Sequence, residues 1–210
     1  MNKLFATLLI AATSVSAGAA GLESLENFVR TAKSGRAEFT QVVTAPARDG
    51  QAARSKTSSG TFEFSRPNRF RFSYKKPFEQ TIVADGQTLW LYDVDLKQVT
   101  SRKQEQVLGA TPAALIASSP DLNALKKDFN LEAIADRDGM QWVQATPKAK
   151  DGQLNSVKIG FRGAELAALE ILDGFGQRSV MTFSKMDVAA PVPADAFQFT
   201  PPKGADLVKQ

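Results

Sequence analysis

The chain contains no histidine and no cysteine in its 210 residues. Without histidine, His-dependent catalytic triads and zinc sites of the usual ligand type are excluded. Without cysteine, the chain has no thiol nucleophile and no disulfide to hold a domain together. A mechanism based on carboxylates alone stays open, because a glycosidase requires only two such groups. The fold must therefore be stabilised by burial of apolar side chains.

The carboxylates are distributed as turn residues rather than as a catalytic pair. Asp85, Asp138, Asp151 and Asp173 each directly precede a glycine, which is typical of tight turns. The stretch "GATPAA" lacks the lysine of a phosphate-binding loop, and "DGFG" is too short for a dinucleotide fingerprint. We therefore expect no enzyme activity, no catalytic residue, no metal site and no cofactor.

Long runs of one character are also missing. After residue 20, no apolar run approaches the roughly 20 residues that a membrane-spanning helix requires. The net charge is +4, but no run of five or more charges of one sign occurs. This pattern predicts a soluble mature protein and gives no indication of nucleic-acid binding.

The first 20 residues, "MNKLFATLLIAATSVSAGAA", have the layout of a cleavable secretory signal. One early positive charge is followed by a short apolar run and then by small residues. Cleavage sites of the A-x-A type are present at both 17–19 and 18–20, and the sequence does not decide between them. We expect residues 1–20 to be removed after export and residues 21–210 to form a single domain.

The remaining chain has mainly the period-2 alternation of β-strands. Eleven strands are expected, most of them joined by short antiparallel turns, over residues 38–44, 60–65, 69–74, 80–85, 87–95, 97–101, 129–135, 140–147, 155–161, 165–173 and 177–188. Residues 45–59 are expected to form an exposed loop. So many strands favour a sheet that curls on itself.

Two segments have helical patterns instead. Leu22, Leu25, Phe28, Val29 and Ala32 recur at helical spacing and predict an amphipathic helix that ends near residues 34–35, with a glycine as C-cap. A second helix is predicted over residues 111–118, because a threonine N-cap precedes a proline at its start. A short further helix is expected after residue 121.

Aromatic residues alternate along two of the expected strands. Phe62, Phe64, Phe70, Phe72 and Tyr74 occupy one face of a predicted hairpin. Three further groups can join them: the Trp90/Tyr92 pair or the Leu89/Leu91 pair, and Trp142. In a closed small barrel these side chains fill the core. In a half-open barrel they line a pocket for an apolar ligand, and periodicity does not distinguish the two.

Arg66 lies at the bend of the same hairpin, before Pro67. The proline favours an extended conformation for Arg66, which fixes the direction of its side chain. Two interpretations follow. The arginine is exposed at the bend, or its guanidinium donates hydrogen bonds to carbonyls at the C-terminal end of a neighbouring helix.

Four segments, "RPNRFRF", "ADGQTLWLYD", "TPAALIA" and "FQFTPPKG", together resemble the periplasmic outer-membrane lipoprotein carrier proteins, the LolA family. The resemblance extends in order over essentially the whole mature chain. It implies a mainly β fold, an unclosed antiparallel β-barrel of about eleven strands covered by a helical lid. It also implies a periplasmic carrier that binds the acyl chains of lipoproteins and performs no chemistry.

The resemblance further implies partners and site residues. The carrier is expected to receive lipoproteins from an inner-membrane ABC transporter of the LolCDE type and to deliver them to an outer-membrane acceptor lipoprotein of the LolB type. Arg66 would act as a latch on the lid by bonding backbone carbonyls of Val29, Ile116 and Ala117. The residues expected in an apolar cargo cavity are Phe62, Phe64, Phe70, Phe72, Leu89, Trp90, Leu91, Leu115 and Trp142. Phe70 is also assigned to the cargo or transporter interface.

Other functions stay open at this point. A carrier of the same fold could transport another lipid or a glycolipid, because a fold does not determine its cargo. A carboxylate hydrolase and a scaffold protein with a sealed aromatic core are weaker alternatives. Arg69 and Arg71 make the other face of their strand basic, either toward an anionic lipid or partner or simply toward solvent. A monomer is expected.

Overall fold

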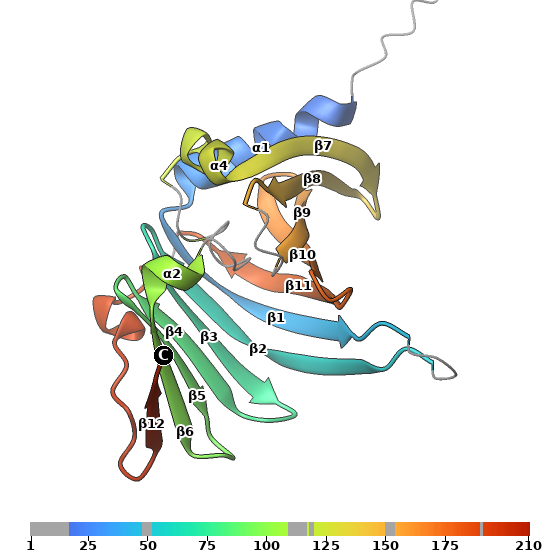
Figure 1. Cartoon of the computed structure of the whole chain (residues 1–210). Coiled ribbons are helices and arrows are strands. Elements are labelled where there is room, and N and C mark those ends of the chain that lie inside the picture. Colours follow the sequence, from blue (N-terminus) through green and yellow to red (C-terminus); the bar gives the residue numbers. More distant parts are fainter. Residues whose placement is uncertain (1–16, 48–51, 109–116, 118–119, 150–153, 190) are drawn as a thin grey trace, which may run out of the picture.

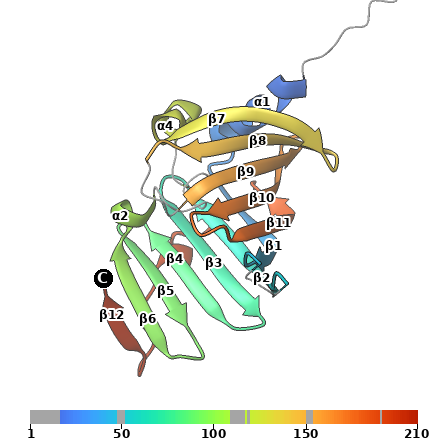
Figure 2. The same ribbon diagram turned by 45° about the vertical axis from the view of Figure 1, so that its right-hand side comes forward.

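A single twelve-stranded sheet that curls around an apolar interior forms most of the protein (Figures 1 and 2). The computed structural model describes residues 17–47, 52–108, 117, 120–149, 154–189 and 191–210. The order of strands is β12-β6-β5-β4-β3-β2-β1-β11-β10-β9-β8-β7. The first and last strands of this order do not pair with each other, so the barrel is unclosed, as the family resemblance implied.

The elements have the following bounds. The first six strands are β1 (Ser34–Thr44), β2 (Ser55–Ser65), β3 (Arg69–Lys76), β4 (Gln80–Asp85), β5 (Thr88–Asp93) and β6 (Gln98–Lys103). The others are β7 (Phe129–Arg137), β8 (Met140–Pro147), β9 (Leu154–Arg162), β10 (Glu165–Asp173), β11 (Arg178–Asp187) and β12 (Asp206–Lys209). The helices are α1 (Ala17–Thr31), α2 (Gln104–Leu108), α4 (Leu122–Asp128) and the 3-10 helix η1 (Ala194–Phe197).

All eleven predicted strands are present, and the differences lie at their ends. Strand β1 begins at Ser34, so Gly35 lies in a strand and does not cap the first helix, which ends at Thr31. Strand β2 begins at Ser55 and pairs with β1 as far as Thr44, so the predicted loop over 45–59 is shorter than expected. Strand β12 was not predicted. It pairs in parallel with β6, whereas the other strand pairs are antiparallel.

Helix α1 lies against strands β7, β8 and β9, inside the curl of the sheet. Its predicted apolar face is buried, since Leu25, Phe28, Val29 and Ala32 are each at most 4% exposed. A Cβ atom at Gly21 would lie 2.7 Å from the carbonyl oxygen of Trp142, so the start of the helix approaches β8 more closely than a larger residue permits. No helix in the described part of the chain is long and apolar enough to span a membrane.

Helix α4 begins where the sequence predicted. The Asp121 carboxylate accepts a hydrogen bond of 2.8 Å from the backbone N–H of Ala124, which is an N-cap bond. The helix predicted over 111–118 lies outside the described residues except for Ala117, which is helical and buried.

The convex side of the sheet carries a second, smaller apolar layer. The chain after β11 returns along this side through η1 to β12 and covers β3 to β6 (Figure 1). Phe197 of this segment is 2% exposed, and Phe199 packs against the rings of Trp90 and Tyr92. The two faces of strands β3 to β6 therefore contact different partners, the interior on one side and the C-terminal segment on the other.

Candidate functional site

The concave face of β2 and β3 is an aromatic surface. Phe62 pairs with Phe72 across the two strands, with ring centroids 4.5 Å apart, and Phe64 pairs with Phe70. These four rings are at most 7% exposed, and they belong to one apolar cluster with residues of α1 and of strands β9 to β11. The predicted alternation is thus confirmed, and it directs the rings into the curl of the sheet.

The structure decides between the two pairs of β5 residues that the sequence left open. Leu89 pairs with Ala84, and Leu91 pairs with Ile82, and both partners belong to or pack on the interior cluster. Since directly paired residues lie on the same face of an antiparallel sheet, the leucines face the interior. Leu115, also expected there, lies outside the described residues.

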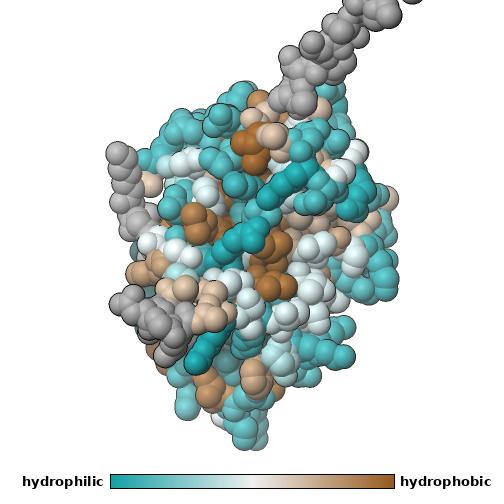
Figure 3. Space-filling view, turned by 90° about the vertical axis from the view of Figure 1, so that its right-hand side faces the viewer, coloured by the Kyte–Doolittle hydropathy of each residue, from teal (hydrophilic) through white to brown (hydrophobic). Residues whose placement is uncertain are grey.

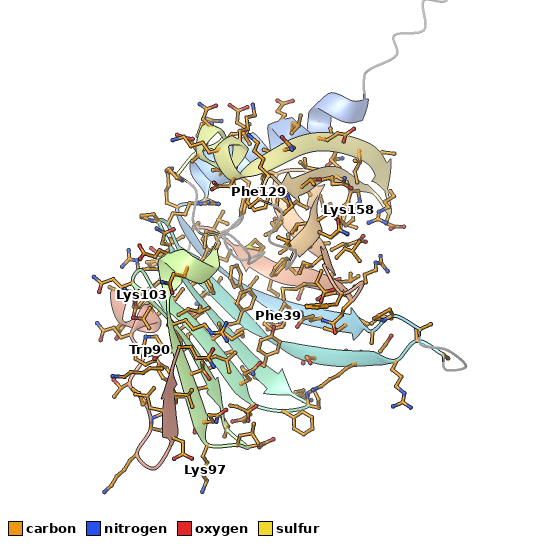
Figure 4. The ribbon with its side chains drawn as sticks, viewed as in Figure 1. Phe39, Trp90, Lys97, Lys103, Phe129 and Lys158 are labelled. Atoms are coloured by element: carbon orange, nitrogen blue, oxygen red, sulfur yellow. The ribbon has the colours of Figure 1, made fainter. Side chains whose placement is uncertain are left out.

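Both tryptophans were wrongly assigned to the cavity. Trp90 lies on the convex side, where its indole nitrogen donates to Asp85 at 2.9 Å and its ring contacts Phe199 (Figure 4). Trp142 also faces away from α1. Its ring lies against Gly160 on one neighbouring strand, and the Arg137 guanidinium lies 4.3 Å from the ring centroid. Successive side chains of a strand point to opposite faces of the sheet. Leu89 and Leu91 flank Trp90, and Val143 follows Trp142; because these neighbours face the interior, both tryptophans face away from it.

Arg66 is buried at one end of this aromatic surface, with 9% of its area exposed. Its Nε donates a hydrogen bond of 2.8 Å to the carbonyl oxygen of Ala32, just after the end of α1. Its backbone N–H donates to the carbonyl of Lys33, also at 2.8 Å. The guanidinium lies 5.5 Å and 5.6 Å from the ring centroids of Phe28 and Phe64. The interpretation of an exposed arginine is therefore excluded.

Burial lowers the pKa of the Arg66 guanidinium to about 10, because the charged form loses solvation. The side chain nevertheless stays protonated at neutral pH. A charged donor that is enclosed by aromatic rings and bonded to a helix carbonyl is a strong contact that requires the helix to stay in place.

The carbonyls that meet the β2–β3 turn differ in part from those expected. Among the described residues, the Arg66 side chain bonds Ala32 rather than Val29, although both lie on α1 or at its end. The Ala117 carbonyl was also expected to bond the Arg66 guanidinium. It accepts a hydrogen bond of 2.9 Å from the backbone N–H of Asn68, in the same turn. Ile116 lies outside the described residues.

Gln104 is a further contact that the sequence did not indicate. It is 1% exposed at the start of α2. Its side-chain nitrogen donates to the carbonyl of Asn68 at 2.6 Å, and its side-chain oxygen accepts from the N–H of Gly86 at 2.9 Å. One amide thus connects the β2–β3 and β4–β5 turns to α2. The sequence near Gln104 contains no signal for this role, because both bonds are to residues that are distant in the chain.

Arg69 and Arg71 hold the C-terminal segment rather than facing solvent alone. The Arg69 guanidinium lies 5.7 Å from the Phe197 ring centroid, and Arg71 donates to the carbonyl of Ala196 at 3.1 Å. Both side chains are on the convex side of β3, opposite the phenylalanines. The basic character of this face therefore has a structural use in the packing of η1.

Polar groups cross the concave face at the other end of the aromatic surface. The Tyr74 hydroxyl donates to the side-chain oxygen of Gln41 at 2.9 Å, and the amide nitrogen of Gln41 donates to the hydroxyl of Ser179 at 2.7 Å. The Tyr74 ring packs edge-on against Phe39, at 5.0 Å between centroids. Figure 4 shows Phe39 directed into the space enclosed by the sheet. We call Gln41, Tyr74 and Ser179 the polar belt.

Strands β2 and β3 approach each other closely at Gly60, near the polar belt. A bulge between Ser59 and Gly60 changes the register of β2 and β3. A Cβ atom at Gly60 would lie 2.1 Å from the carbonyl oxygen of Ser73, so only glycine fits. Tyr74 pairs with Gly60 in the same register as Phe72 with Phe62, so Tyr74 continues the concave face beside Phe39, and the bulge lies just beyond this pair.

Two of the described carboxylates, Asp85 and Glu170, form hydrogen bonds or ion pairs within the fold. The described residues contain no group of three or more potential metal-ligating side chains. Burial raises the pKa of Asp85, but hydrogen bonds from Thr88, Trp90 and Gln87 outweigh it and leave that pKa below its usual value. At Glu170, burial is likewise outweighed by Arg137 and Arg178, which lower the pKa. Both groups stay ionised, as expected of structural carboxylates rather than general acids.

Comparison with known families agrees with this geometry. A family model described as "Outer membrane lipoprotein carrier protein LolA" matches residues 30–200. The chain belongs to the LolA family. A LolA-family relative from Albidiferax ferrireducens, named outer-membrane lipoprotein carrier protein, is 68% identical over 99% of this chain and 100% of its own. One from Methylibium petroleiphilum, with the same name, is 55% identical over 96% of this chain and 97% of its own.

Solved structures are more distant. A LolA superfamily protein from Nitrosomonas europaea has a TM-score of 0.48 and 13% identity, with 86% of this chain and 98% of that chain covered. A putative outer membrane lipoprotein-sorting protein domain from Vibrio parahaemolyticus has a TM-score of 0.49 and 10% identity, with 86% and 95% covered. Family membership rests on the sequence relatives and not on these structures.

Proposed function

We propose that this LolA-family chain carries lipoproteins through the periplasm by enclosing their acyl chains in the curl of its sheet. One observation carries the proposal: the concave face of an unclosed sheet is apolar, and at one end of it the buried, charged side chain of Arg66 is bonded to the end of α1. The names of its close relatives, outer-membrane lipoprotein carrier proteins, support the same cargo.

The need for a carrier follows from the cost of exposing acyl chains to water. Each methylene moved from water into an apolar site contributes about 0.8 kcal/mol, and a lipoprotein has dozens of them. The aromatic rings of β2 and β3 offer an apolar surface that can replace water around these chains. In this form Phe28 of α1 contacts Phe64 of β2 and Phe161 of β9, so cargo must displace α1 in order to enter.

The hydrogen bond of Arg66 favours release of the cargo. Hydrogen bonds from a charged donor contribute roughly 1.5–3 kcal/mol each. Opening breaks the bond to Ala32, and closure restores it. The closed, empty form is thereby stabilised relative to the loaded form, which weakens the net affinity for cargo and favours its delivery.

The direction of transport requires two partners. We propose that an inner-membrane transporter of the LolCDE type supplies the cargo and that an outer-membrane acceptor of the LolB type receives it. The carrier itself would use no ATP, act as a monomer, and reach the periplasm by means of the signal in residues 1–20.

Cargo capture tests the function directly. The tagged mature protein would be expressed in a Gram-negative periplasm, purified without detergent and examined by native mass spectrometry. Triacylated lipoproteins bound at a ratio of one to one would support the proposal. Free lipids or glycolipids without lipoproteins would favour the alternative carrier function. An empty protein that also fails to bind an apolar dye would contradict both.

A further inference from the structure

A cavity of about 630 Å³ opens at the end of the concave face that is opposite to Arg66. Arg66 lies in the turn that joins β2 and β3, whereas the cavity reaches the turns that join β1 to β2, β3 to β4 and β5 to β6, at the other end of the strands. The side chains at its base include Gln41 and Tyr74 of the polar belt. We call this space the mouth cavity.

The polar belt separates the mouth cavity from the aromatic surface. On one side of the belt, the Tyr74 ring contacts Phe39 and Phe72. On the other side, the cavity is lined by Gln80, Lys56 and Asp93 as well as by apolar residues. Hydroxyl and amide groups therefore lie at the boundary between an apolar interior and a cavity with both polar and apolar lining residues.

The outer wall of the mouth cavity is both apolar and charged. Phe78 is 57% exposed and Leu96 69% exposed, each at the tip of a turn. The Lys56 ammonium lies 4.7 Å from the centroid of the Phe78 ring. Figure 3 views the side of the molecule that is on the right in Figure 1, and it shows hydrophobic residues (brown) beside hydrophilic ones (teal). A wall of this kind suits neither a bare acyl chain nor a purely polar solute.

We propose that the mouth cavity binds the polar junction of the cargo, where ester and amide groups join the acyl chains to the polypeptide. The inference rests on the proposed carrier function. An amphiphile must place its polar groups where they can form hydrogen bonds and its methylenes where they cannot. The acyl chains would thus lie beyond the polar belt toward Arg66, and the polypeptide would leave between the turns that carry Phe78 and Leu96.

Site-specific cross-linking tests this orientation. A photo-reactive phenylalanine analogue would replace Phe78 at the mouth or, in a matched control, Lys33 beside the Arg66 end of the fold. Both side chains are exposed, so neither replacement removes a core contact. The probe is a synthetic triacylated lipopeptide with a tag on its peptide. Its binding to each variant would be measured separately by co-elution.

An adduct between the peptide tag and position 78, with none at position 33, is the expected result. An adduct at position 33 alone, or none at either position while the probe co-elutes, would overturn the inference and leave the carrier function intact. A probe that does not bind either variant or the unmodified protein would overturn both.

The polar belt gives a second, independent test. Gln41→Leu removes an amide that both donates and accepts in the belt. We expect a three- to tenfold loss of affinity for the lipopeptide, about the contribution of one hydrogen bond, and no loss for an uncharged apolar dye. Gln144→Leu is the control, because Gln144 pairs with Lys158 on the convex side. An equal change for both ligands, or no change for either, would contradict a polar-junction site.

Discussion

At the scale of single residues, Arg66 loses solvation on burial but gains a favourable contact at the end of α1. Removing a guanidinium from water is unfavourable, as its lowered pKa reflects. Helix C-termini have carbonyls without partners in their own helix, and a cation there is favoured by the helix dipole. The Ala32 carbonyl is such a group. The position of α1 therefore contributes to the stability of Arg66 in its buried position.

Replacing Arg66 tests the proposed release mechanism. Arg66→Leu keeps an apolar side chain in the same space but removes the bond to Ala32. We expect the variant to accept a lipoprotein and to transfer it to acceptor-bearing membranes at least tenfold more slowly, because closure no longer offsets the loss of cargo contacts.

The matched control is Arg69→Leu, whose guanidinium packs on Phe197 at the convex side and not on α1. A lipoprotein transfer assay would follow both variants over time. Transfer by Arg66→Leu at the rate of the unmodified protein would exclude a role for this side chain in release.

Tyr74 predicts a dependence of stability on alkaline pH. Burial raises the pKa of Tyr74 from 10.0 to about 12. Because the folded-state value is the higher one, its contribution to the free energy of unfolding is present below pH 10 and is lost as the pH rises toward 12. Two pKa units correspond to on the order of 2–3 kcal/mol. Denaturant titrations between pH 9 and 12 should show this loss in the unmodified protein and in Tyr92→Phe, but a smaller one in Tyr74→Phe.

At the scale of elements, the segment after β11 closes the convex side of β3 to β6. Phe197 packs against the Arg69 guanidinium and is 2% exposed, whereas Phe175, in the turn between β10 and β11, is 84% exposed. Replacing each phenylalanine by the same residue therefore separates the loss of buried packing from the chemical change itself. It also tests whether the short helix η1 contributes to the fold.

We expect Phe197→Ala to lower the free energy of unfolding by about 3–5 kcal/mol, which is usual for a buried phenylalanine. Phe175→Ala should change it by less than about 0.5 kcal/mol. Chemical denaturation monitored by tryptophan fluorescence measures both, since Trp90 lies beside Phe199 of the same segment. Equal effects of the two substitutions would mean that the C-terminal segment is not part of the cooperative core.

The elements that the sequence predicted best were those with a regular local period. The alternation at Phe62 and Phe64 predicted a buried strand face, and Asp121 predicted the start of α4. Strand β12 could not be predicted, because its four residues are exposed and depend on β6, which is distant in the sequence. Trp90 was misplaced for a related reason: alternation reveals two faces but not which of them is the interior.

The site was predictable only in part for the same physical reason. Arg66 was marked by its bend and by the family resemblance, but the carbonyl that it bonds depends on the position at which α1 ends. The contact of Gln104 with two turns, and the bond between Tyr74 and Gln41, join residues that lie far apart in the chain. Local patterns carry no information about such pairs.

At the scale of the whole molecule, loading should affect the lid contacts and spare the centre of the sheet. The N–H groups of Arg66 and Asn68 bond carbonyls outside the sheet, at Lys33 and Ala117. Strands β1 and β2 pair along eleven residues and lie in the middle of the strand order. The two sets of amides belong to regions of different expected stability.

Hydrogen exchange would compare the empty protein with the protein bound to the triacylated lipopeptide. We expect exchange at Arg66 and Asn68 to become at least tenfold faster on loading, while amides of the β1–β2 pairing stay protected. Uniform protection of both regions on loading would indicate that cargo binds without opening at the Arg66 end.

The absence of pairing between β7 and β12 has a consequence for the range of cargo. In a closed barrel, the number of strands and their stagger determine the radius, so the interior volume cannot change without breaking a ladder of backbone bonds. Here no such ladder joins the two ends of the strand order. The sheet can widen by a small change of twist at every strand pair, with all its backbone pairs intact. We therefore expect that one carrier of this design can change the width of its interior to fit acyl chains of different length and number, with the loss of side-chain contacts alone.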